Sequence, residues 1–85
     1  MQYDKQLREV LSNNGILLQD SDQDELYFDS IQFISLIVDI EREFEIEMPD
    51  EYMDGKLLNN YDDLLDVVTM IKREEIKRYN EEAIN

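Results

Sequence analysis

The stretch from Ser30 to about Glu45 constrains the fold more than any other part of the sequence, because its apolar side chains recur at helical spacing. At roughly 100° per residue they cover more than half of the circumference of a helix. A helix that is apolar over so wide an arc packs against several neighbours and leaves only a narrow polar strip. We therefore expect it at the centre of a helical bundle. Its apolar residues are Ile31, Phe33, Ile34, Leu36, Ile37, Val38, Ile40 and Phe44.

Shorter segments on either side of this helix supply its neighbours. Residues 3–13 carry apolar side chains at helical spacing, and Gly15 follows as a natural C′ residue. Pro49 favours the start of a short helix, which Gly55 is expected to end. Asn60 is expected to cap a last helix with one apolar face. That face consists of Tyr61, Leu64, Leu65, Val68 and Ile71.

Length and pattern together indicate one small domain. A chain of 85 residues buries too little surface to form two separate hydrophobic cores. We predict an all-α fold, a small bundle of three principal helices plus one short helix. Its first loop is long, about 14 residues from Gly15 to Phe28. The bundle is expected to span residues 1–71, and residues 72–85 to form a charged C-terminal helical extension or tail.

The sequence contains neither cysteine nor histidine, which excludes several classes of function. No disulfide can form, so the chain needs no oxidising compartment and we expect it in the cytoplasm. Nucleophile systems built on histidine or cysteine are excluded, as are nearly all zinc sites. The chain is also short for a water-excluding pocket of the usual size. We therefore expect no enzymatic activity and no metal centre.

The charge of the chain is strongly negative and concentrated in its middle. There are 22 acidic and 8 basic residues, which gives a formal net charge of −14 at pH 7. The segment from Asp20 to Asp66 contains sixteen acids and only two bases, Arg42 and Lys56. Such a surface repels nucleic-acid phosphates and anionic membranes, so neither is an expected partner. Partner proteins should instead present basic patches.

Asp29 and Ser30 interrupt the apolar pattern where the central helix begins. One interpretation is structural: Asp29 as the N-cap forms a capping box with Gln32, and Ser30 is incidental. The other is functional, because a helix N-terminus offers unpaired amides and a partial positive charge to a phosphate attached at Ser30. Asp29 would then be a candidate metal-binding carboxylate. The dipeptide alone does not decide between the two interpretations.

The longer segment ELYFDSIQFISLIVDIEREFEIEMPDEYM, residues 25–53, combines several features in register. Asp-Ser-Ile opens the helix, aliphatic residues run through it, an acidic segment ends at Phe44, and Met-Pro-Asp leads into a short helix. In this order the features resemble the acyl carrier protein family around its phosphopantetheine-attachment serine. Two departures stand out. Tyr27 occupies a position where the family commonly has glycine, and Gln32 and Ser35 are uncharged where many fatty-acid carriers are acidic.

This resemblance implies a covalent cofactor and a set of partners. A phosphopantetheinyl transferase would move 4′-phosphopantetheine from coenzyme A to Ser30, and acyl groups would be held on its terminal thiol as thioesters. Asp29 would contact the transferase or its metal ion. The protein would be a free-standing, monomeric acyl carrier protein serving acyl-loading and acyl-processing enzymes in fatty-acid, polyketide or specialised biosynthesis. Docking of partners would involve Ile31, Gln32, Ser35, Asp39, Arg42 and Glu43.

Two other functions remain open. An aminoacyl or peptidyl carrier, including the D-alanyl type, fits the uncharged Gln32 and Ser35. An unmodified acidic adaptor or nucleic-acid mimic would bind basic proteins through the charge of residues 20–66 and would need no attached group. Calcium binding by an EF-hand is disfavoured, because Glu25 stands where that loop needs glycine and Ile31 where it needs a bidentate glutamate.

Overall fold

The computed structural model describes residues 3–53 and 58–84, and the side chains of the last helix as far as Ile76. The regular secondary structure of these residues is helical. No β-strand occurs within these residues, so the predicted all-α bundle of three principal helices and one short helix is confirmed. None of the described helices is long and apolar enough to cross a membrane. The elements are α1 (Asp4–Asn13), α2 (Ser30–Phe44), the 3₁₀-helix η1 (Asp50–Tyr52) and α3 (Tyr61–Ile84).

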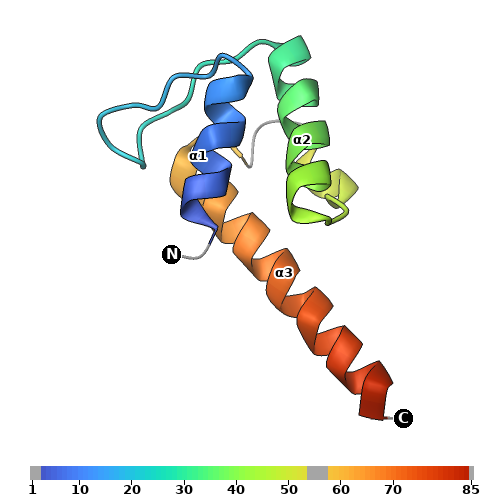
Figure 1. Cartoon of the computed structure of the whole chain (residues 1–85). Helices are drawn as coiled ribbons and strands as arrows, with labels where there is room; N and C mark the ends of the chain where they lie inside the picture. The colour runs from blue at the N-terminus through green and yellow to red at the C-terminus, as the bar shows by residue number, and fades with distance from the viewer. Residues whose placement is uncertain (1–2, 54–57, 85) are drawn as a thin grey trace.

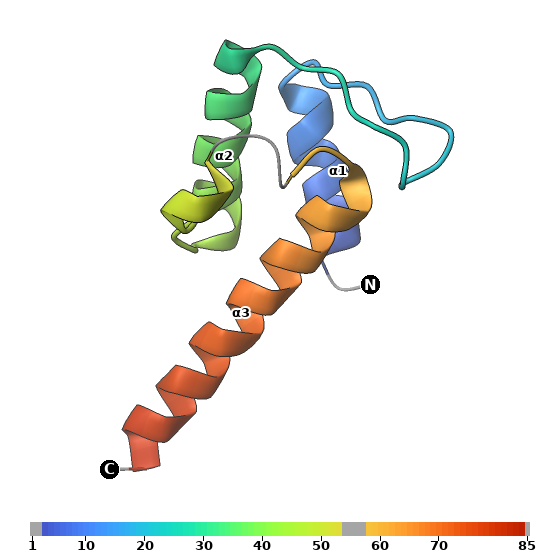
Figure 2. The ribbon, with the colours of Figure 1, turned by 180° about the vertical axis from the view of Figure 1, so that it is seen from behind.

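The three α-helices form two layers. α1 and α2 lie side by side and run in opposite directions, because the long loop between them leaves and re-enters the bundle at the same end (Figure 1). α3 begins beside α1 and crosses this pair obliquely, as the view from behind shows (Figure 2). It then continues past both helices towards the C-terminus. The long first loop predicted from the sequence is confirmed.

The end of α1 follows from Gly15, as predicted. Gly15 has a positive φ of 72°, a conformation that costs glycine little because it has no Cβ. Its N–H donates to the carbonyl of Ser12, and the N–H of Ile16 donates to the carbonyl of Leu11, each over 3.0 Å. This pair of bonds is a Schellman motif. It turns Ile16, which is 2% exposed, back into the core beside Leu11.

The start of α3 also matches its prediction. The side-chain oxygen of Asn60 accepts a hydrogen bond from the N–H of Asp63 over 2.8 Å, which satisfies one of the free amides of the first turn. From there the helix runs without interruption to Ile84. η1 begins directly after Pro49, while the predicted end of that helix at Gly55 lies outside the described residues.

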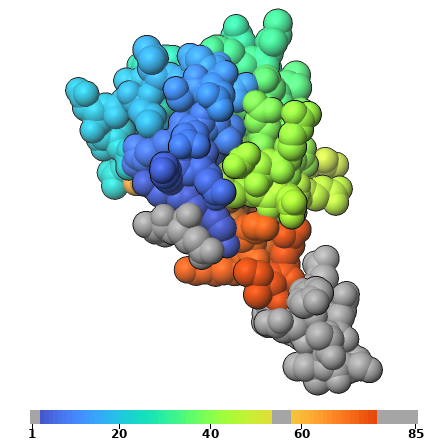
Figure 3. Space-filling view, in the orientation of Figure 1, coloured from blue at the N-terminus to red at the C-terminus, as the bar shows by residue number. Residues whose placement is uncertain are grey.

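A single hydrophobic core lies between the two layers. The side chains of α1 and α2 meet along the face seen in Figure 3. All five residues predicted for the apolar face of α3 are buried. The core comprises Leu7, Val10, Leu11, Ile16, Leu26, Phe33, Leu36, Ile37, Ile40, Phe44, Ile46, Met48, Leu58, Tyr61, Leu64, Leu65, Val68 and Ile71.

The prediction that α2 is covered around most of its circumference is wrong. Ile31, Ile34 and Val38 are 79%, 57% and 44% exposed, respectively. The physical reason is the number of neighbours: α1 and α3 together cover only one side of α2, and the described part of the chain has no further long helix to cover the other. α2 therefore has an apolar surface as well as an apolar core face.

Candidate functional site

α2 begins at Ser30 because Asp29 caps it. Asp29 Oδ1 accepts a hydrogen bond from the N–H of Gln32 over 2.7 Å, and Gln32 Oε1 accepts one from the N–H of Asp29 over 3.0 Å. Asp29 has the extended backbone typical of an N-cap, with φ −89° and ψ 178°. The predicted capping box is confirmed. It fixes Ser30 as the first helical residue.

Ser30 is exposed, and its hydroxyl forms no hydrogen bond with another described residue. The capping box uses the amides of Asp29 and Gln32, and the first intrahelical bond runs from the N–H of Phe33 to the carbonyl of Asp29 over 3.0 Å. Within the described residues, the amides of Ser30 and Ile31 have no partner, and the first turn contains no acid. These amides and the positive end of the helix dipole suit a phosphate attached at Ser30.

The loop that leads to Ser30 is paired with the start of α3. A single antiparallel bridge joins Glu25 to Asn60. Next to it, the N–H of Leu26 donates to the carbonyl of Asn59 over 2.8 Å, and the Leu26 side chain is 5% exposed. Because both backbone and side chain are fixed here, the loop reaches Ser30 along a defined path.

Aromatic side chains complete the approach to α2. The ring of Phe28 stacks on that of Phe33, with the centroids 5.3 Å apart and the planes at 20°. Tyr27, which stands where the family commonly has glycine, is 72% exposed and does not enter the core. It helps to line an open depression of about 580 Å³ between the loop and Asn59, directly beside Asp29.

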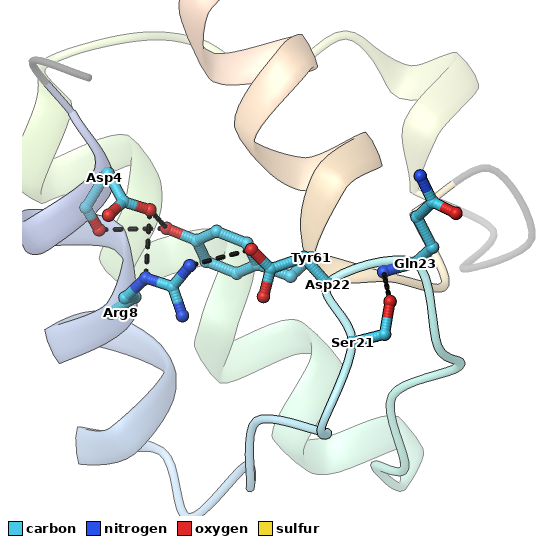
Figure 4. A network of polar contacts seen from close by, with 6 residues as sticks. All are labelled: Asp4, Arg8, Ser21, Asp22, Gln23 and Tyr61. Atoms are coloured by element: carbon cyan, nitrogen blue, oxygen red, sulfur yellow. Dashed lines mark hydrogen bonds and ion pairs between the residues drawn. The ribbon is translucent and has the colours of Figure 1, made fainter.

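A polar network ties the middle of the same loop to α1 and α3 (Figure 4). Arg8 lies at its centre: Nη2 donates to Asp22 Oδ2 over 2.8 Å, and Nε donates to Asp4 Oδ1 over 3.0 Å. The Arg8 guanidinium also lies over the Tyr61 ring, 4.3 Å from its centroid. The N–H of Asp62 donates to the carbonyl of Asp22 over 3.0 Å. The loop is therefore fixed at its middle as well as at its end.

Contacts within this network shift the pKa values of Tyr61 and Asp4 in opposite directions. The Tyr61 hydroxyl donates to the backbone carbonyl of Asp4 over 2.9 Å and also to the Asp4 carboxylate. Burial, followed by the hydrogen bond to Asp4, raises the pKa of Tyr61 above its ordinary value of 10.0. The bond from Tyr61 in turn lowers the pKa of Asp4 below its ordinary value of 3.8. At neutral pH Asp4 is thus an anionic acceptor and Tyr61 a neutral donor.

Three of the six predicted docking residues contact α1 instead of facing only solvent. Gln32 Nε2 donates to the backbone carbonyl of Asn14 over 3.3 Å, and Ser35 Oγ donates to Asn14 Oδ1 over 2.6 Å. Asn14 Nδ2 donates to Asp39 Oδ2 over 2.9 Å. Asn14 therefore holds the end of α1 against α2, a role that the sequence analysis missed. The available signal was its position before Gly15, where a helix ends.

The remaining predicted docking residues face solvent. Ile31 directly follows Ser30 and is 79% exposed. Ile34 and Val38 come three and seven residues after Ile31, and this spacing places all three on one side of α2. Helical spacing identifies this common side, but it does not reveal that the side is uncovered. The docking residues that are exposed and have no side-chain hydrogen bond to a described residue are Ile31, Arg42 and Glu43.

Comparison with known proteins identifies a family. The family model described as "Phosphopantetheine attachment site" matches residues 5–71, a range that includes Ser30. No curated protein and no solved structure matches the chain. This domain implies a covalently attached 4′-phosphopantetheine cofactor, and carriers of this kind interact with a phosphopantetheinyl transferase and with partner enzymes. The chain belongs to this phosphopantetheine-binding family, the family of the acyl carrier proteins that its central segment resembles.

Proposed function

We propose that the protein is an acyl carrier in which Ser30 is the residue that bears 4′-phosphopantetheine. The observation that carries this proposal is the exposed Ser30 hydroxyl, free of hydrogen bonds to the described residues, at the first position of α2 within the family match. The arm would hold an acyl group as a thioester and present it to partner enzymes. The protein itself would perform no turnover.

The residues around Ser30 have separate roles in this proposal. Asp29 and Gln32 fix the start of α2, and so they set the direction in which the hydroxyl points. The amides of Ser30 and Ile31 are available to the phosphate oxygens of the attached group. Asp29 Oδ1 accepts the capping hydrogen bond from Gln32. Because Asp29 is exposed, its carboxylate is also accessible to a transferase or its metal ion.

The charge of the chain supports the delivery of an intermediate between enzymes. Tethering converts bimolecular delivery into a local search, because the acyl group is held near each docked enzyme. The formal charge of −14 would attract enzymes with basic surfaces and raise the rate of encounter. Such attraction gives fast association without tight binding, which suits a carrier that must release its partner after each step.

The chemical class of the cargo is a separate question. An acyl group of a fatty-acid, polyketide or specialised pathway is our first candidate, and an aminoacyl or peptidyl group, including D-alanine, is the second. The structure offers a local reason for the uncharged Gln32 and Ser35, since both contact Asn14. Their lack of charge therefore does not by itself favour the second candidate. Loading assays with acyltransferases and with amino-acid ligases would separate the two.

The test of Ser30 uses coexpression with a broad-specificity phosphopantetheinyl transferase, followed by intact-mass measurement. We expect wild-type protein to gain one phosphopantetheine group and Ser30→Ala to gain none. Ser12→Ala is the matched control, because Ser12 is also exposed and lies on α1; it should be modified like wild type. A wild-type mass that never changes with any transferase would favour the unmodified acidic adaptor, which does not need Ser30.

A further inference from the structure

The side-chain amide of Gln32 joins the start of α2 to the end of α1. Its Oε1 accepts a hydrogen bond over 3.0 Å from the N–H of Asp29, the residue before Ser30. Its Nε2 donates to two backbone carbonyls at the end of α1, that of Asn14 over 3.3 Å and that of Gly15 over 3.4 Å. One planar amide therefore connects the capping box at Ser30 with the segment in which α1 ends.

These two carbonyls lie where a helix leaves its backbone acceptors without intrahelical donors. No other hydrogen bond between described residues ends on the carbonyl of Asn14 or Gly15. They also lie at the negative end of the α1 dipole. A carboxylate in place of the Gln32 amide would offer them no donor and would be repelled by them. The uncharged side chain at this position thus has a physical reason.

The other contacts around Ser30 do not connect it to α1. The loop before it is held at Leu26, but that hydrogen bond leads to the start of α3. Ser35 donates to the end of α1, but it lies one turn further along α2 and has no bond to the capping box. Among hydrogen bonds between described residues, those of Gln32 Nε2 are the ones that join residues 29–32 to the end of α1. The position of Ser30 relative to α1 therefore depends on this amide.

We propose that Gln32 is a positioning residue for the modification of Ser30, and that it acts through the donor half of its amide. By holding the capping box against the end of α1, Nε2 sets where the Ser30 hydroxyl lies relative to the rest of the bundle. Because it concerns the reaction at Ser30, this role rests on the proposed function. It differs from the docking role expected from the sequence, since Gln32 acts within the protein and not on a partner.

Gln32→Glu separates the two halves of the amide. Glutamate keeps an oxygen that accepts a hydrogen bond from the N–H of Asp29, as in other capping boxes, but at neutral pH it has no donor for the carbonyls of α1. We would measure kcat and KM for the transfer of phosphopantetheine from coenzyme A to the apo protein by a broad-specificity transferase. We expect kcat to fall about tenfold while KM stays within about twofold of wild type, because a displaced hydroxyl reacts slowly on an otherwise unchanged protein.

A docking role for Gln32 predicts the opposite sign. An additional carboxylate on α2 would strengthen the attraction to a basic enzyme, so Gln32→Glu would lower KM and raise kcat/KM. Gln23→Glu is the matched control for charge, because it makes the same chemical change at an exposed position of the first loop. Its kcat and KM should each stay within about twofold of wild type.

Asn14→Ala separates position from stability. It removes the side-chain bonds to Asp39 and Ser35 but keeps both backbone carbonyls that Gln32 binds. Its kcat should therefore stay within about twofold of wild type even though the fold is less stable. Nuclear magnetic resonance tests the wild-type protein directly. The side-chain amide protons of Gln32 should show nuclear Overhauser contacts to Gly15, because a Cβ at residue 15 would lie only 3.5 Å from Nε2.

The outcomes separate the positioning role from the proposed function. An unchanged or higher kcat for Gln32→Glu would overturn the positioning role, as would an equal loss of kcat in Gln23→Glu or Asn14→Ala. Absence of the contacts between the Gln32 amide and Gly15 would also overturn it. In all of these cases Ser30 is still modified and the proposed function stands. Failure of every transferase to modify wild-type Ser30 would instead remove the proposed function itself.

Discussion

Replacing Asn14 by alanine tests whether this side chain holds α1 to α2. The substitution removes two contacts between the helices, the bond from Asn14 Nδ2 to Asp39 at 2.9 Å and the bond from Ser35 to Asn14 Oδ1 at 2.6 Å. It also removes a bond of 2.8 Å to the carbonyl of Val10 within the same turn. We therefore expect a loss of stability without loss of the fold.

The size of the loss follows from what each bond contributes. A hydrogen bond to a carboxylate contributes about 1.5–3 kcal/mol and one between neutral groups about 0.5–1.5 kcal/mol. Asp39 is half-buried and Ser35 is exposed, so water replaces part of what is lost. We expect the free energy of unfolding of Asn14→Ala to fall by about 2 kcal/mol. In urea this shifts the midpoint by about 1–2 M.

Asn13→Ala is the matched control, because it makes the same chemical change one residue earlier, at an exposed position with no side-chain hydrogen bond to a described residue. Its free energy of unfolding should stay within about 0.5 kcal/mol of wild type. Both variants are measured by urea titration followed by far-ultraviolet circular dichroism. Asn14 does not hold α1 to α2 if Asn14→Ala is as stable as wild type, or if Asn13→Ala loses as much stability as Asn14→Ala.

Three further predictions concern other features of the bundle. Asp4→Asn should lower the urea midpoint near pH 6, because the pKa of Asp4 is depressed in the folded protein. The difference from wild type should be lost as pH falls below the ordinary pKa of 3.8, and a difference that persists in acid would contradict this prediction. Gly15→Ala should lower the free energy of unfolding by about 1 kcal/mol through the positive φ of residue 15. Steric contact adds nothing to this cost, because the added Cβ would lie at an ordinary 3.5 Å from Gln32 Nε2; unchanged stability would argue against the positive φ. Thr69→Val should raise the free energy of unfolding by about 1 kcal/mol, since Thr69 Oγ1 is buried without a hydrogen-bond partner among the described residues. A lower stability of Thr69→Val would indicate that Oγ1 forms a hydrogen bond that the structure does not show.

Sequence predicted those parts of the fold that depend on neighbours along the chain. The end of α1 at Gly15, the box formed by Asp29 and Gln32, and the cap at Asn60 are each determined within about one helical turn, because capping groups satisfy the free amides and carbonyls of that turn. Hydrophobic period likewise located the three principal helices. The same period could not predict that Ile34 is exposed, because exposure depends on how many other helices pack against α2.

Contacts between distant residues escaped the sequence analysis for a related reason. Arg8 lies on α1 and Asp22 in the middle of the long first loop, and Asp4 and Tyr61 lie near opposite ends of the bundle's sequence. No local pattern distinguishes an aspartate that pairs with Arg8 from the many other acids of this chain. Ser30 is a different case: helix-end chemistry showed only that a phosphate would be favourable there, and the resemblance of residues 25–53 made it the candidate site.

The two sides of α2 beside Ser30 should have different roles, one in the stability of the fold and the other in recognition by the transferase. Ser35 is polar and was expected to dock partners, yet its hydroxyl donates a hydrogen bond to Asn14. Ser35→Ala should therefore lower the free energy of unfolding by about 1 kcal/mol and leave transferase kinetics within about twofold of wild type. Ile34 is apolar and was expected in the core, yet it is 57% exposed; Ile34→Ser should change kinetics and not stability. Parallel urea and transferase measurements on both variants decide this. If Ser35→Ala impaired the transferase while Ile34→Ser did not, the polar side of α2 and not its apolar side would be the docking surface.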